Sequence, residues 1–348
     1  MKKSLIAMAV LAASGASFAQ SNVTLYGLAD VWFGSVKTER GGASLTQTVM
    51  QSGGVNGSRW GLKGSEDLGG GLKANFKLEQ GFSLDTGKAK DLAPKIDGSP
   101  EAGNAAFARY AYVGLSGGFG EVKFGKTGTA YDDVSGASDA VFDSALAPMN
   151  SVFTSVNYNW NPANTIYYQA PNMGGFSGAI SYSLGEDKTP TTGASSLTSL
   201  NLTYEHGPLA LQFGYQVEDI VNTPAKPNDV KFLRLGGSYD FGMATAKLTY
   251  GKTTSIGNKD GYDAKEFQVG VDVPVSSALT LSASYAKSDD SNPAGVFEPS
   301  RKGYGLAAAY TLSKRTFLYG GYRSNTETQQ NAPDNKDSVF AIGIQHKF

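Results

Sequence analysis

The sequence predicts an all-β protein, a 16-stranded antiparallel transmembrane β-barrel, from three observations. Apolar and polar residues alternate with a period of two along most of the chain after residue 20, which is the pattern of strands with unlike faces. Short turns marked by Gly or Pro alternate with long polar connections. The composition is rich in Gly (44 residues) and Tyr (18 residues) but only 18% charged, which favours a polar β protein over a helical membrane protein.

Composition also excludes several classes of protein. The chain of 348 residues contains no Cys, which removes disulfides, thiolate metal sites and cysteine nucleophiles. Two His residues leave little room for a His-rich metal centre or a His-based acid–base relay. Lys and Arg number 30 against 31 Asp and Glu, and this balance argues against a nucleic-acid partner. We therefore predict no cofactor and no nucleic-acid binding.

The first 19 residues are typical of a secretory signal peptide. Lys2 and Lys3 precede an apolar stretch from Leu5 to Ala13, and the small-residue ending Ser17-Phe18-Ala19 fits a cleavage site. The alternative is a membrane anchor, but the apolar core is only about half of the ~20 residues that a spanning helix needs. Residues 20–348 are then expected to form a single barrel, without a transmembrane helix.

The alternation is clearest in residues 71–83. One face carries Leu72, Ala74, Phe76, Leu78 and Phe82, and the other carries Lys73, Asn75, Lys77 and Glu79. The same pattern recurs in residues 197–206, 209–218, 266–273 and 279–285. Each of these segments is predicted to be a strand with one apolar and one polar face.

The connections between strands fall into two groups. Seven short turns are predicted at 65–70, 116–120, 172–175, 206–208, 241–242, 274–277 and 313–314. Eight long polar segments are predicted near 36–54, 84–103, 127–160, 186–196, 219–229, 253–263, 289–301 and 325–336. Fifteen connections join sixteen strands, and an even number with short turns at one end and long loops at the other is typical of an outer-membrane barrel.

A secreted β-sandwich is the alternative that also alternates, because its apolar faces meet in a sealed core. Here Lys, Glu, Gln and Asn occupy the polar face in the middle of strands, which a barrel with a wet interior explains better. Hydrocarbon also requires every backbone group to be paired, as closure ensures. Aromatic residues that suit interfacial girdles are Tyr204, Tyr215, Tyr239, Tyr250, Tyr285 and Tyr310. The last strand ends in Phe348, with Phe340, Ile342 and Ile344 on the same face.

Several motifs resemble Gram-negative general-diffusion porins of the β-proteobacterial type. They are Val23–Gly27, Ser58–Gly64, Glu66–Ala74, Arg109–Leu115, Gly118–Gly125 and His346–Phe348. The resemblance spans nearly all of residues 20–348. It implies an outer-membrane homotrimer for passive diffusion of ions and small hydrophilic solutes, with outer-membrane lipid around it. It also implies that the third long loop, about 127–160, folds inward to form a constriction.

In such porins a basic wall faces acidic residues on the inward loop, and the matching wall residues are Arg59 and Arg109. Parity agrees: Arg59 alternates with Trp60, and Arg109 alternates with Tyr110 and Tyr112, so both arginines should point into the lumen. A third wall arginine of the family falls at Asn161 here, which weakens the positive side. Other charged residues on the lumen parity, for which a solvated face and a selectivity role are equally good readings, are Lys63, Lys73, Lys77, Lys123 and Glu79.

On the inward loop, Asp139 and Asp143 match the family's acidic pair by their distance from Gly125, and Asp132 and Asp133 lie nearby. Opposed charges in a narrow aqueous slot set up a transverse field and govern ion preference. Because one arginine is missing, we expect weak selectivity of undetermined sign.

Two rival functions remain to be weighed. A barrel enzyme needs a nucleophile with a base in reach, but His206 lies in a short turn, His346 lies on the apolar parity, and no G-x-S-x-G occurs. A sugar-specific channel would need an aromatic slide, for which Tyr131, Phe142 and Tyr167 are the candidates, and a surface adhesin would use the long loops. We therefore predict a channel and not an enzyme.

Overall fold

The computed structural model describes residues 22–90, 105–221, 229–293 and 299–348, so the predicted signal peptide lies outside the described residues. The first strands are β1 (Asn22–Arg40), β2 (Ala43–Ser52), β3 (Arg59–Gly69), β4 (Leu72–Phe82), β5 (Ala89–Lys90), β6 (Tyr110–Gly117), β7 (Gly120–Lys126), β8 (Thr165–Gln169) and β9 (Phe176–Leu184). The others are β10 (Ser196–His206), β11 (Leu209–Asp219), β12 (Val230–Asp240), β13 (Thr245–Thr254), β14 (Asp263–Pro274), β15 (Leu279–Ser291), β16 (Ser300–Ser313), β17 (Thr316–Glu327) and β18 (Asn335–Lys347).

Among the described residues, helical structure is confined to single turns between strands. The helices are α2 (Asp132–Ser135), η1 (Val141–Asp143), α3 (Met149–Val152) and η2 (Ile256–Asn258). Within the described ranges, none is long and apolar enough to cross a membrane.

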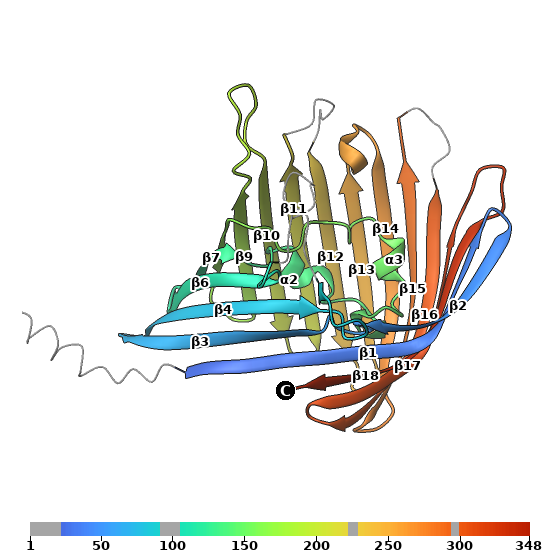
Figure 1. The fold of residues 1–348 in the computed structure, drawn as a ribbon, viewed down its shortest axis with the longest axis horizontal. Helices are drawn as coiled ribbons and strands as arrows, with labels where there is room; N and C mark the ends of the chain where they lie inside the picture. Colours follow the sequence, from blue (N-terminus) through green and yellow to red (C-terminus); the bar gives the residue numbers. More distant parts are fainter. Residues whose placement is uncertain (1–21, 91–104, 222–228, 294–298) are drawn as a thin grey trace, which may run out of the picture.

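The strands form one closed antiparallel sheet (Figure 1). Its eighteen segments amount to sixteen wall strands. The segments β2 and β3 both pair with β1, at Val31↔Ser52 and Leu28↔Arg59, so they are one wall strand interrupted at 53–58. The two-residue β5 pairs with β4 at Gly81 and Phe82, next to the stretch of β4 that pairs with β6, and adds no separate wall strand. Pairing of β1 with β18 closes the circle, which confirms the predicted 16-stranded barrel.

The prediction of a long connection at residues 36–54 is wrong in detail. Strand β1 continues to Arg40, β2 begins at Ala43, and only Gly41 and Gly42 turn between them. The irregular stretch lies further on, at 53–58, and the buried carboxylate of Asp30 holds it in place. Asp30 accepts hydrogen bonds from the backbone N–H groups of Gly54 (2.9 Å), Val55 (3.1 Å) and Asn56 (2.9 Å), and from the Tyr319 hydroxyl (2.5 Å). A charge is tolerated there because every acceptor position is used.

The two faces of the wall follow the predicted parity in most strands. Large apolar side chains on one face are well exposed, for example Val23 (61%), Leu202 (61%) and Ile342 (58%). The last strand also follows the predicted parity, since Phe340, Ile344 and Phe348 are exposed. An exposed apolar face that runs around the whole barrel is stable in hydrocarbon and not in water. We call this the apolar face, and the opposite one the polar face.

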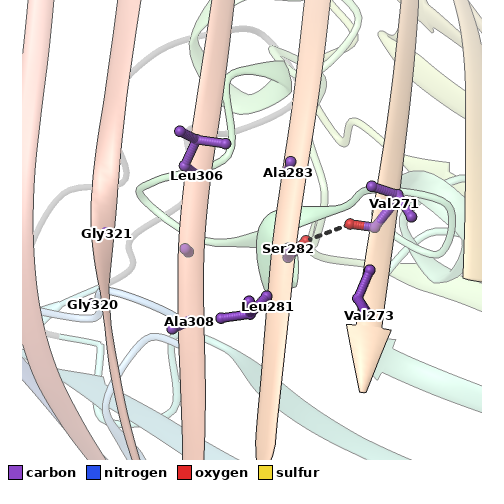
Figure 2. A pocket seen from close by; sticks show the side chains of 10 residues that line it. Val271, Val273, Leu281, Ser282, Ala283, Leu306, Ala308, Gly320 and Gly321 are labelled. Carbon is purple, nitrogen blue, oxygen red and sulfur yellow. Dashed lines mark hydrogen bonds between the residues drawn. The ribbon is translucent and has the colours of Figure 1, made fainter. Parts of the chain in front are cut away.

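The apolar face has a hollow of about 410 Å³ across strands β14 to β17. Figure 2 shows the side chains that line it. It forms where the small residues Ala283, Ala308 and Gly320 lie between larger ones such as Leu281 and Leu306. Its lining is nearly all apolar, so this hollow belongs to the outer belt and offers no groups that would bind a hydrophilic solute.

Candidate functional site

The connection between β7 and β8, residues 127–164, packs against the polar faces of much of the wall. The backbone N–H of Tyr131 donates to Ser199 Oγ on β10 (2.7 Å), and that of Val141 donates to Ser282 Oγ on β15 (2.7 Å). Arg323 on β17 donates to the Ala145 carbonyl (2.7 Å). Figure 1 shows α2 and α3 near the middle of the strands rather than beyond their ends. The β7–β8 connection is therefore held by side chains from many strands.

Glycines on the polar face let this connection approach the wall. A Cβ on Gly236 would collide with Ser138 Oγ, one on Gly270 with the Ala140 side chain, and one on Gly305 with the Leu146 carbonyl. These glycines are needed for close approach and not for an unusual backbone conformation.

Two buried charges anchor the connection, and sequence reasoning missed both. Arg234 on β12 is 1% exposed and donates to the Ser135 carbonyl and to Ser155 Oγ (2.8 Å). Glu266 on β14 accepts hydrogen bonds from the backbone N–H groups of Thr154 and Ser155. Each lies on the polar parity of its strand, but that parity alone does not distinguish a lumen charge from one buried beneath a loop.

Three of the predicted basic wall residues, Arg59, Lys77 and Arg109, meet at one cavity. A cavity of about 430 Å³ is lined by Arg59, Lys77 and Arg109 together with Glu79 and Tyr26. Glu79 pairs with Arg109 (Nε–Oε1 2.8 Å) and with Lys77 (Nζ–Oε2 3.3 Å), and it accepts the Tyr26 hydroxyl (2.8 Å). We call this the basic cavity, because four basic side chains, those of Arg59, Lys77, Arg109 and Lys347, line it beside the Glu79 carboxylate.

The parity argument for Arg109 is wrong, although the residue does reach the polar face. Tyr110 pairs with Glu79 and Tyr112 with Lys77 in the β4–β6 register, so both tyrosines lie on the polar face. Arg109 precedes β6, and its guanidinium reaches back to Glu79. Tyrosine fits either face because its ring is apolar and its hydroxyl is polar.

Lys63 and Asn161 have different positions. Lys63 on β3 extends over the Tyr26 ring, with its Nζ 5.2 Å from the ring centre. Asn161 is not on a wall strand, because β8 begins only at Thr165. It is buried in the β7–β8 connection and donates to the carbonyls of Ala108 and Arg109, both at 3.0 Å. Asn161 thus positions the backbone at Arg109 and does not present a side chain at the surface.

Two of the predicted loop acids face arginines. Asp132 and Asp143 line a cavity of about 350 Å³ together with Arg109 and Arg234; we call this the mixed cavity. Tyr158 donates to Asp132 Oδ1 (2.6 Å). Removal of the carboxylate from water raises the pKa of Asp132 to about 7, although the hydrogen bond from Tyr158 opposes this shift.

The other two acids lie elsewhere. Asp133 accepts the Tyr167 hydroxyl (2.6 Å) and the Asn201 amide (3.2 Å), on the β8–β10 side. Asp139 is 2% exposed, and its carboxylate oxygens find no hydrogen-bond partner among the described residues. Burial, with the nearby Asp143 carboxylate, raises the pKa of Asp139 well above its usual range. Because Asp139 is buried, it does not present its side chain at the surface, contrary to the prediction from the sequence.

The segment that presents Asp143 is strained. Val141, Phe142 and Asp143 have φ values of 59°, 64° and 48°, a left-handed run that costs roughly 1–2 kcal/mol per residue outside glycine. The Ser144 hydroxyl donates to the Val141 carbonyl (2.6 Å) and helps to hold the turn. The strain lies where an exposed carboxylate is displayed, and surrounding contacts maintain it.

The aromatic-slide candidates do not form a surface. Tyr131 is completely buried and Tyr167 is 3% exposed, whereas Phe142 is partly buried and packs against the cluster around Trp32 and Val141. Within the described ranges, no group of three or more His, Asp or Glu side chains is arranged to hold a metal ion.

The fold and the charged cavities define a transmembrane β-barrel protein of the outer membrane. The family model for Gram-negative porins matches residues 5–330. An outer membrane porin protein of Bordetella pertussis is 30% identical, with 100% of both chains covered. Outer membrane porin protein 32 of Delftia acidovorans is 34% identical, over 99% of this chain and 95% of that one.

Among solved structures, the anion-selective porin from Comamonas acidovorans aligns with a TM-score of 0.77 at 25% identity. The alignment covers 94% of this chain and 100% of that porin. The chain therefore belongs to the Gram-negative porin family, as its motifs indicated.

The anchoring role of Glu266 is testable. Glu266→Gln replaces one acceptor oxygen with a donor that faces backbone N–H groups, which we expect to cost about 1–3 kcal/mol of local stability. Hydrogen–deuterium exchange of the peptide spanning 149–158 should then be roughly tenfold faster or more. Glu205→Gln, at an exposed position of β10, should leave that exchange unchanged. Equal exchange in wild type and Glu266→Gln would contradict the anchoring role.

Proposed function

We propose that the protein forms a water-filled channel through which ions and small hydrophilic solutes diffuse passively across the outer membrane. The polar faces of the wall surround the lumen, and the β7–β8 connection narrows it. The observation that carries this proposal is the mixed cavity, where Arg109 and Arg234 face Asp132 and Asp143. A sixteen-stranded barrel is otherwise wide enough for an aqueous pore, so this region sets the cut-off.

We further propose a modest preference for anions. The basic cavity is lined by four basic side chains and by the carboxylate of Glu79. On the β7–β8 connection, Asp139 is buried, and Asp132 is only partly ionised near neutral pH because of its raised pKa. The excess of cations lowers the electrostatic barrier for anions more than for cations. The Comamonas acidovorans relative is described as anion-selective, which supports the same sign here.

Removal of the wall charges tests this proposal. In a planar bilayer with a KCl gradient, we expect Arg59→Gln/Arg109→Gln to lower the chloride-to-potassium permeability ratio roughly two- to fivefold. Arg315→Gln removes an equal charge at the exposed β16–β17 turn and should not change the ratio. An unchanged ratio in the double variant would refute the wall's role, and absence of any channel current in wild type would refute the function.

The raised pKa of Asp132 predicts that the ion preference of the channel depends on pH. Its pKa of about 7 means that the carboxyl is ionised at pH 8 and mostly protonated at pH 6. Lowering the pH removes a negative charge from the connection, so the preference for anions should rise between pH 8 and 6. Asp132→Asn should reduce this change, whereas Asp85→Asn at an exposed position should preserve it. The same rise in wild type and Asp132→Asn would exclude Asp132 as its source.

We also propose that the protein assembles as a homotrimer, on the basis of its membership of the porin family. The mass of the detergent-solubilised complex measured by native mass spectrometry should equal three chains. A single-chain mass under conditions that preserve channel activity would rule out the trimer.

A further inference from the structure

Aromatic rings and cations alternate over one part of the polar face, on strands β1 to β7. Lys77 Nζ lies 3.6 Å from the centre of the Tyr110 ring and 6.0 Å from that of Tyr26. Farther along the wall, Lys123 Nζ lies 5.6 Å from the Tyr112 ring centre. The strands that carry these residues lie next to one another on the near side of the barrel in Figure 1. Cation and ring therefore form a continuous surface rather than isolated pairs.

The rings also contact one another and the β7–β8 connection. Tyr110 packs edge to face with Tyr112 (centroids 6.4 Å apart) and with Trp160 (6.0 Å). The Arg109 guanidinium lies 4.9 Å from the centre of the Trp160 ring. All of these rings, and Tyr26, are only partly buried. They keep part of their surface available, unlike Tyr131 and Tyr167.

The basic cavity offers a small ligand both room and a charged partner. Its volume of about 430 Å³ exceeds that of a single benzene ring with a carboxylate, and it contains the Tyr26 and Tyr110 rings. Glu79 satisfies Lys77 and Arg109 through ion pairs. Among the described residues, Arg59 has no hydrogen-bond or ion-pair partner, although it lies within electrostatic range of Arg109 and Glu79. One guanidinium is thus available to an incoming anion.

The combination selects for a particular solute class. A simple inorganic anion needs the cations but not the rings, and an uncharged sugar gains little from an unpaired guanidinium. A small aromatic carboxylate uses both, because its carboxylate pairs with Arg59 while its ring packs against tyrosine edges and accepts a lysine ammonium on its face.

We propose that the basic cavity, with the adjacent rings Tyr26 and Tyr110, is a binding site for small aromatic carboxylates on their way through the lumen. The proposal rests on the channel function proposed above and adds a solute class to it. Arg59 holds the carboxylate, and the two tyrosine rings, together with Lys77, recognise the aromatic ring.

Benzoate and cyclohexanecarboxylate are the probes, because they share charge and approximate size but differ in aromaticity. Each is added to wild-type channels that conduct chloride, and the concentration that halves the chloride current is measured. Benzoate should act at a concentration about two- to fivefold lower than cyclohexanecarboxylate. Equal concentrations for the two probes in channels with normal chloride current overturn the site and leave the channel function standing. Absence of chloride current in wild type overturns both.

Variants separate the rings from the charge. Tyr26→Leu/Tyr110→Leu should remove the advantage of benzoate, while Tyr26→Phe/Tyr110→Phe, which keeps the rings, should preserve it. Arg59→Gln should raise the half-blocking concentrations of both probes. Lys73→Met removes a cation from the same face of β4, outside the cavity lining. This variant should leave the half-blocking concentrations of both probes unchanged. Loss of the benzoate advantage in the Phe variant, or its persistence in a folded Leu variant, would overturn the assignment of the rings.

Discussion

Hydrocarbon offers no hydrogen-bond partner to a peptide group, and the rest of this structure depends on the way the barrel meets that constraint. The sheet leaves no open edge, since β1 pairs with β18 on one side and with β2 and β3 on the other. The seam continues to the last residue, where Gly27 and Phe348 exchange two backbone hydrogen bonds of 3.0 Å. Closure separates an apolar face from a polar one, and that separation makes a charged interior possible.

Inside the wall, charge takes over part of the role that a hydrophobic core has in a soluble protein. Buried ionic groups are costly unless their hydrogen-bonding capacity is filled. Asp30 and Glu266 meet that condition with backbone groups of irregular segments. Arg234 meets it in part, through the Ser135 carbonyl and Ser155 Oγ. Apolar packing assists, as in the cluster of Trp32, Val141 and other buried residues. The β7–β8 connection is therefore a fixed part of the wall's polar face, and the charges that it carries keep defined positions.

The two faces constrain sequence unequally, and this explains where parity succeeds and fails. Lipid excludes polar side chains from the apolar face, so the alternation there identifies strands reliably. The polar face accepts any side chain that hydrogen-bonds or packs, including aromatic ones. Tyr110 and Tyr112 occupy it and thereby invert the apparent phase of β6. A tyrosine-rich strand cannot be oriented by counting apolar residues alone.

The sequence by itself determined the class of fold, the number of wall strands, most of their facing and the regions that carry the charged site. These follow from local periodicity and from motifs, which a linear chain displays directly. Only the tertiary structure decided the partners: Glu79 between Lys77 and Arg109, Arg234 and Glu266 beneath the β7–β8 connection, and Asp139 buried. The physical reason is that exposure and pairing of a charge depend on segments far apart in sequence, which meet only when the barrel closes.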